Sequence, residues 1–182
     1  MNQLKKWSVI LLVCAFSLAL VAATPVQAKK PLIGAMDLEF NLGWTGPSED
    51  VPEWVGTITI NEVEYGMVFF NLGTGKPFDS AGEGNVLFYG EIWAIYEWVT
   101  FDFESQELET GDLILMGTDK GVLSFANNKY RMNGVVTEVA VGWEIYNGRN
   151  VHMSGYIEWQ IVYTPDGPVV APYKAPGIFR IN

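Results

Sequence analysis

Apolar and polar residues alternate along most of the chain, which is the pattern of half-buried β-strands. The clearest example is residues 32–42, in which Met36, Leu38, Phe40 and Leu42 alternate with Asp37, Glu39 and Asn41. Segments of similar character recur at residues 54–60, 65–72, 85–99, 113–118, 121–126, 130–141, 150–163 and 177–182. Short turns separate most of them, among them Asp119-Lys-Gly, so strands that are neighbours in the sequence are expected to be neighbours in the sheet.

Residues 85–99 are apolar on both alternating faces and are interrupted only by Glu91 and Glu97. They predict a long central strand that ends at an acidic turn over residues 102–112. Because a one-layer barrel buries only its inner face, something must cover the outer face of this strand. We expect either the proline-rich segment 164–176, which otherwise has no regular pattern, or a homo-oligomer.

No window keeps helical apolar spacing over three turns, so the chain is predicted to be all-β. The predicted fold is a single antiparallel β-barrel of about eight strands, with a β-sandwich as the second choice.

The N-terminus has the pattern of a secretory signal peptide: Lys5 and Lys6, an apolar run over residues 7–23, and small residues before a cleavage site after Ala28. We therefore predict a signal peptide over residues 1–28, a β-barrel domain over residues 29–182, and a secreted or extracytoplasmic location. The only cysteine, Cys14, falls within the signal, so the mature chain would fold without disulfides.

Loss of Lys5 and Lys6 changes the formal net charge from -10 to -12. This charge argues against binding to nucleic acid. Aromatic residues make up 14% of the chain, which suits a pocket for a small lipophilic molecule as well as ordinary core packing.

Glu91 is the most conspicuous acid in an apolar setting, because it shares a strand face with Trp93. Desolvation would raise the pKa of such a carboxyl group unless it is paired. The alternatives are that Glu91 pairs with an arginine such as Arg131 across the sheet, or that it faces water.

Several kinds of chemistry are disfavoured by spacing. Glu91 and Glu97 would lie about 20 Å apart along one strand, whereas the paired carboxyl groups of glycosidases are about 5 to 9.5 Å apart. His152, the only histidine, would lie roughly 7 Å from Ser154 on the same strand, so a Ser-His-acid triad is not expected. We predict no metal site, no cofactor and no catalytic residue.

The segments WVGTIT (54–59), FYGEIW (88–93), KYRMNGVVTE (129–138), SGYIEW (154–159) and GIFRIN (177–182) resemble a group of secreted, uncharacterised prokaryotic proteins. These in turn resemble the allene oxide cyclase and dirigent β-barrels, which are trimers. The resemblance implies that Glu39 and Asn41 match a Glu-x-Asn pair on the first strand of the cyclases, in which the Asn helps to bind the epoxide substrate and the Glu counters developing positive charge. The chain lacks the Gly-Gly-Ser/Thr-Gly-x-Phe signature of those families and has no cysteine in its mature part.

These observations predict that the protein binds a small apolar ligand inside the barrel, with the loop 73–84 at its mouth. Glu39, Asn41, Glu91 and Trp93 are the predicted ligand-binding residues. The alternatives are a cyclase or isomerase of the allene oxide cyclase type, and an envelope protein that assembles with itself. The face that strand 32–42 turns inward tests the cyclase alternative, which needs Glu39 and Asn41 in the interior. The alternation instead favours Met36, Leu38 and Phe40 there.

Overall fold

The computed structural model describes residues 30–182 except 47, 49, 72–75, 78–84 and 125–126, and describes only the backbone of residues 76–77, 85–86 and 88–90. The predicted signal peptide, residues 1–28, lies outside the described residues. So does most of the predicted mouth loop 73–84, apart from β4 (Lys76–Pro77), whose backbone pairs with β5.

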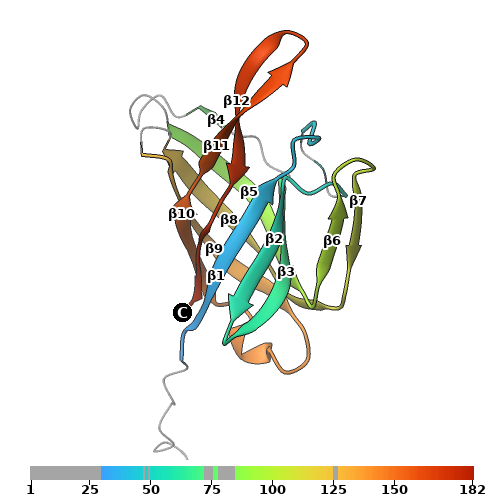
Figure 1. The fold of residues 1–182 in the computed structure, drawn as a ribbon. Coiled ribbons are helices and arrows are strands. Elements are labelled where there is room, and N and C mark those ends of the chain that lie inside the picture. Colours follow the sequence, from blue (N-terminus) through green and yellow to red (C-terminus); the bar gives the residue numbers. More distant parts are fainter. Residues whose placement is uncertain (1–29, 47, 49, 72–75, 78–84, 125–126) are drawn as a thin grey trace, which may run out of the picture. The chain divides into compact units, whose positions relative to one another are not determined.

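Eight antiparallel strands close into a barrel, which confirms the predicted fold (Figure 1). Around the barrel the order is β1, β13, β10, β9, β8, β5, β3 and β2, and β2 pairs again with β1. The strands are β1 (Leu32–Phe40), β2 (Trp54–Ile60), β3 (Val63–Asn71), β5 (Asn85–Tyr96), β8 (Leu113–Ser124), β9 (Lys129–Val139), β10 (Asn150–Tyr156) and β13 (Gly177–Ile181). A barrel of about eight strands is just wide enough to be filled by side chains or to hold one small ligand.

The alternation in β1 places its apolar face inside, as the sequence favours. Met36 and Leu38 are buried, whereas Asp37 is exposed on the outer wall. One part of the interior is packed solid around Trp93 and Phe179, whose rings meet edge to face at 5.2 Å and are fully buried. This packed region forms the main hydrophobic core of the molecule.

A second, smaller core lies on the outer wall of the barrel and covers the outward apolar face of β5. Val55, Val68 and Ala94 are buried there, on β2, β3 and β5. The hairpin of β6 (Val99–Asp102) and β7 (Glu107–Thr110) packs Phe101 and Leu108 against them. The prediction that residues 164–176 cover this face is therefore wrong, because the hairpin 99–110, most of which was predicted as an acidic turn, supplies the cover. The homo-oligomer remains a prediction.

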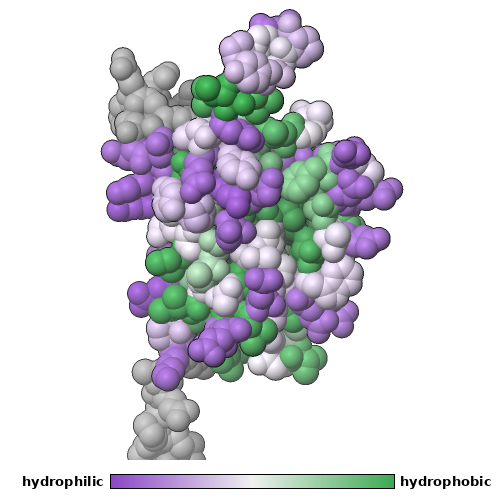
Figure 2. Space-filling model, in the orientation of Figure 1, coloured by the Kyte–Doolittle hydropathy of each residue, from purple (hydrophilic) through white to green (hydrophobic). Residues whose placement is uncertain are grey.

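Residues 164–176 take part in a hairpin instead of breaking the regular pattern. β11 (Glu158–Thr164) and β12 (Gly167–Lys174) pair along their length, and β12 joins the barrel through Lys174 opposite Glu39 of β1. Prolines are tolerated at a sheet edge because no ladder hydrogen bond is lost there. The hairpin projects beyond one end of the barrel in Figure 1, and Figure 2 shows apolar surface at its base and a more polar tip.

The predicted turn at Asp119-Lys-Gly is also wrong, because β8 continues straight through these residues. Asp119 is buried, Lys120 is exposed and Gly121 is buried, so the alternation of a strand is unbroken. The only helix among the described residues is the short 3-10 turn η2 (Glu144–Tyr146), and no helix there is long and apolar enough to cross a membrane.

Candidate functional site

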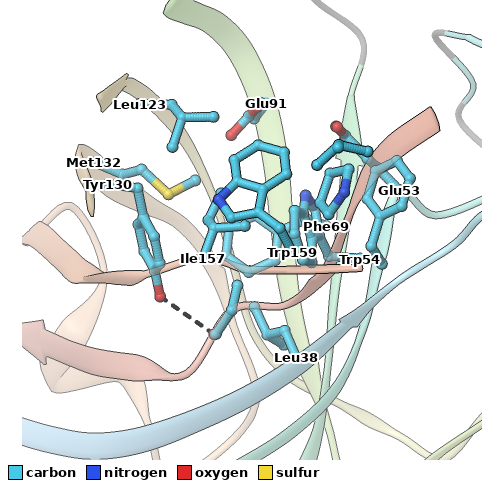
Figure 3. Close-up of a pocket in the computed structure, with 14 residues that line it drawn as sticks. Leu38, Glu53, Trp54, Phe69, Glu91, Leu123, Tyr130, Met132, Ile157 and Trp159 are labelled. Carbon is cyan, nitrogen blue, oxygen red and sulfur yellow. Dashed lines mark hydrogen bonds between the residues drawn. The ribbon is translucent and has the colours of Figure 1, made fainter. Parts of the chain in front are cut away.

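The barrel interior opens into a pocket of about 390 Å³ next to the β11–β12 hairpin (Figure 3). Apart from two acids, its lining is apolar or aromatic. The lining residues are Leu38, Phe40, Glu53, Trp54, Phe69, Glu91, Leu123, Tyr130, Met132, Ile157, Trp159, Val170, Pro172 and Ala175. A volume of this size lies within the range of about 300 to 1,000 Å³ that is typical of small-molecule sites.

Aromatic side chains from separate strands make up much of the wall. Trp54 of β2 meets Phe40 of β1 edge to face, with ring centroids 5.0 Å apart. Trp159 comes from β11, directly after an irregularity in its pairing with β12, and donates a hydrogen bond from Nε1 to Oδ1 of Asn128 at 3.0 Å. This bond ties the hairpin side of the pocket to the turn before β9.

A row of polar side chains crosses the barrel wall beside this apolar lining. Asn71 of β3 lies opposite Glu91 of β5, and Glu91 lies opposite Asp119 of β8. Glu53, just before β2, hydrogen-bonds to the Asn71 side chain and extends the row. All four residues are buried, although their strands alternate and most inward positions are apolar. The row therefore replaces a stretch of ordinary core.

Glu91 and Asp119 form a buried pair of acids with no basic partner in the part of the chain that the structure describes. Neither Glu91 Oε2 nor either carboxyl oxygen of Asp119 has a hydrogen-bond donor among the described residues. Two carboxyl groups are both acceptors when ionised, so Glu91 and Asp119 can hydrogen-bond to each other only when they share a proton. Burial, together with the charges of Asp119 and Glu53, raises the pKa of Glu91 well above its usual range.

Burial also raises the pKa of Asp119, while its hydrogen bond with Glu91 offsets part of that shift. Because both pKa values are raised and the two groups are coupled, the pair keeps a proton between them and titrates as a unit.

Glu53 is a second acid in the pocket wall whose ionisation is disfavoured. Burial raises its pKa to about 7, and the hydrogen bond to Asn71 offsets part of that effect. Figure 3 shows the Glu53 and Glu91 carboxyl groups on the side of the pocket away from Leu38 and the Tyr130 hydroxyl. Near neutral pH the wall thus carries protons on some of its acids and can exchange them when its surroundings change.

Tyr130 forms part of the opposite side of the pocket. Its hydroxyl donates to the backbone oxygens of Ala175 at 3.4 Å and Pro176 at 3.5 Å, where β12 ends. Burial raises the pKa of Tyr130 far above its usual value, so the phenol stays protonated at any pH near neutrality. Its contact with residues 175–176 helps to fix the hairpin against the barrel.

Of the four predicted ligand-binding residues, only Glu91 lines the pocket. Glu39 lies on the outer wall of β1, opposite Lys174, beside a second and smaller hollow. Asn41 is buried but engaged, because its side chain donates to Pro52 O at 3.0 Å and to Gln106 Oε1 at 2.7 Å. Trp93 is fully buried and packs against Phe179 outside the pocket lining.

The suggested partner of Glu91 is wrong, because Arg131 is exposed on β9 and Glu91 faces Asp119 instead. His152 and Ser154 are both exposed on β10, with His152 Nδ1 2.6 Å from Asn133 Oδ1.

Sequence reasoning missed Glu53 and Asp119. Asp119 precedes Lys-Gly, so it resembles a turn residue. A strand signal was nevertheless present, because Asp119 is in phase with Gly117, Gly121 and Leu123 at every second position, which places it on the inner face. Glu53 follows a proline at a strand start, where alternation gives no guidance. Among the described residues, no three His, Cys, Asp or Glu side chains are placed to hold a metal ion together.

Comparison of the chain with protein-family models, with curated proteins and with solved structures gives no match. The barrel shape alone does not establish the allene oxide cyclase and dirigent superfamily, so that relationship remains a prediction.

Proposed function

We propose that the protein is a secreted β-barrel that binds one small, mostly apolar molecule in its interior. The observation that carries the proposal is the pocket of about 390 Å³, whose lining is apolar or aromatic apart from Glu53 and Glu91. A pocket with this lining presents aromatic and aliphatic side chains to its interior. A bound apolar ligand would bury that surface, which is favourable.

Exposed apolar residues of the β11–β12 hairpin also support the proposal. Val170 lines the pocket and is also 70% exposed, and Ile161 next to it on the hairpin is 63% exposed. Apolar surface thus continues from the hairpin into the pocket, which gives an apolar ligand a path of entry.

An isomerase or cyclase is the second candidate, and a different observation favours it. The Glu91 and Asp119 pair holds a shared proton in an apolar wall, and such a pair can give or take a proton from a bound substrate. In this version Glu91 would be the reacting group, and Glu39, on the outer wall, would have no part. Self-assembly in the envelope has no comparable support among the described contacts.

The test uses N-phenyl-1-naphthylamine, a neutral apolar dye whose fluorescence rises in an apolar site. The mature chain is expected to bind one dye molecule. Leu123→Trp fills the pocket, because Leu123 is buried and lines it, whereas Val122→Trp adds the same bulk on the outside of β8, where Val122 is 38% exposed.

Dye binding should fall at least tenfold in Leu123→Trp and be unchanged in Val122→Trp. Equal binding by both variants, or no binding by the wild-type chain, would refute the proposal. Thermal unfolding of both variants checks that each is folded.

A further inference from the structure

The pocket combines aromatic walls with an excess of acid. Glu53 and Glu91 line it and Asp119 lies opposite Glu91 on β8, whereas no Lys, Arg or His is among the lining residues that the structure describes. Glu91 is 5% exposed, and its Oε2 atom has no hydrogen-bond donor among the described residues. Once the proton shared with Asp119 is lost, a buried carboxylate without a donor costs free energy that a ligand with a suitable donor would recover.

The two acids in the pocket wall should favour some polar head groups over others on an otherwise apolar ligand. A fatty-acid carboxylate would add another negative charge beside Glu53 and Glu91 and would be repelled. A neutral alcohol could donate one hydrogen bond but would leave the acids uncompensated once they ionise. A protonated amine provides both a positive charge and N–H donors for Oε2.

The aromatic lining favours the same choice. Trp54, Phe69 and Trp159 line the pocket together with the two acids. An organic cation is attracted to the faces of such rings, most strongly to tryptophan, and the attraction grows when water is excluded. Carboxyl groups and aromatic rings together are therefore suited to a cationic head carried on an apolar body.

We infer that the ligand is an organic cation, a protonated amine on an apolar body, with its charged nitrogen at Glu91 and Glu53. The inference rests on the proposed function and names the ligand class of that same pocket.

Proton exchange follows from this binding mode. A cation favours the ionised form of Glu53 and of the Glu91 and Asp119 pair, so each bound cation displaces a proton from the wall into the solvent. Affinity for the cation should therefore rise with pH up to the range in which these acids ionise. Among the other charged groups nearby, Lys120 and Arg131 point outward from β8 and β9, and the Tyr130 phenol stays protonated.

The experiment compares three probes of equal chain length: octylammonium, 1-octanol and octanoate. Isothermal titration calorimetry at about pH 5.5 and about pH 8.5 brackets the pKa of about 7 for Glu53. Octylammonium should gain about tenfold or more in affinity between the two pH values, octanol should change little, and octanoate should bind most weakly at the higher pH. Repeating the titration in buffers of different ionisation enthalpy should show the release of a proton.

Variants assign the effect to the pocket. Glu91→Gln and Glu53→Gln keep the shape of the side chain but remove its charge, and each should reduce the preference for octylammonium over octanol. Glu64→Gln, exposed on the outside of β3, is the matched control and should keep the wild-type preference. The neutral dye reports whether each variant keeps the pocket.

The outcomes separate the two proposals. If the dye binds inside the barrel but octanoate binds as tightly as octylammonium at the higher pH, the cationic ligand class is refuted while the binding function stands. If the preference persists in both Gln variants, the assigned acids are wrong and the inference falls. If neither the dye nor any octyl probe binds, the proposed function and the inference fall together.

Discussion

Glu91 of β5 and Asp119 of β8 lie opposite each other on adjacent strands, both buried, with no base between them among the described residues. Buried carboxyl groups are ordinarily paired with a cation or a set of donors, because an isolated buried charge is very costly. This pair can remain inside only by keeping a proton. The arrangement makes both the stability of the barrel and the chemistry of its pocket depend on pH.

The first prediction concerns that dependence. Folded Glu53 has a pKa of about 7 against 4.5 for the ordinary group, so the folded state binds more protons than the unfolded chain between these values. Stability from Glu53 is therefore complete below about pH 4.5 and is lost as the pH rises through about 7, by on the order of 3 kcal/mol.

Urea unfolding at about pH 5 and about pH 8 checks this sign. Glu53→Gln should be more stable than the wild-type chain at the higher pH. Its free energy of unfolding should also fall less between about pH 5 and about pH 8. Glu64→Gln should behave as the wild type. A Glu53→Gln variant with the full wild-type pH dependence would show that Glu53 ionises freely in the folded barrel.

The second prediction concerns the close approach of β8 and β9 behind the acid pair. A Cβ atom added to Gly134 would lie 2.2 Å from the backbone oxygen of Thr118 and 2.8 Å from Asp119 Cβ. Gly134→Ala should therefore destabilise the barrel by about 1 to 3 kcal/mol. Arg131→Ala, exposed on the same strand, is the control and should change stability by less than about 0.5 kcal/mol. Unchanged unfolding of Gly134→Ala would contradict the observed strand spacing.

The third prediction concerns the cover on the outer wall. Leu108 of β7 packs against the core formed by Val55, Val68, Phe70 and Ala94. Leu108→Ser should weaken the hairpin, cost about 2 kcal/mol and cause association in sedimentation, because apolar wall becomes exposed. Leu42→Ser, at a residue that is 50% exposed, should do neither. If Leu108→Ser associates no more than the wild-type chain does, the hairpin is not what covers this wall.

The fold was largely predictable from the sequence, whereas the site was not. Period-2 alternation identified β1 and β2 and the apolar inner face of the barrel, because a half-buried strand is visible in the residues themselves. Alternation could not identify the cover of β5, since residues 102–112 are acidic enough to resemble a turn and Leu108 is the one residue among them that packs against this outer core. Pairing between distant strands also placed Asp119 opposite Glu91, and no local pattern encodes that register.

The Glu-x-Asn match on β1 identified two residues that do not line the pocket. Glu39 is one residue out of phase with Leu38 and Phe40, so a strand that buries its apolar residues must turn Glu39 outward. Asn41 lies just past the strand, where its hydrogen bonds hold the loop rather than face the cavity.

The fourth prediction concerns the hairpin side of the pocket. Trp159 lines the cavity and is held by its bond to Asn128. Trp159→Ala should lower the affinity for N-phenyl-1-naphthylamine about tenfold. Trp159→Phe keeps a ring without the N–H donor, so its affinity should lie between that of the wild-type chain and that of Trp159→Ala. Trp98→Ala, at a tryptophan that is 50% exposed outside the pocket lining, serves as the control. Equal affinity in Trp159→Ala and Trp98→Ala would place the bound dye elsewhere.

The most direct test is a crystal structure of residues 29–182 with 8-bromooctylammonium, in which anomalous scattering locates the bromine. One molecule should lie inside the barrel among Trp54, Phe69 and Trp159, with its nitrogen beside Glu91 and Glu53. A bromine peak only on the outer surface, or an interior filled by side chains where the pocket of about 390 Å³ is expected, would contradict the account.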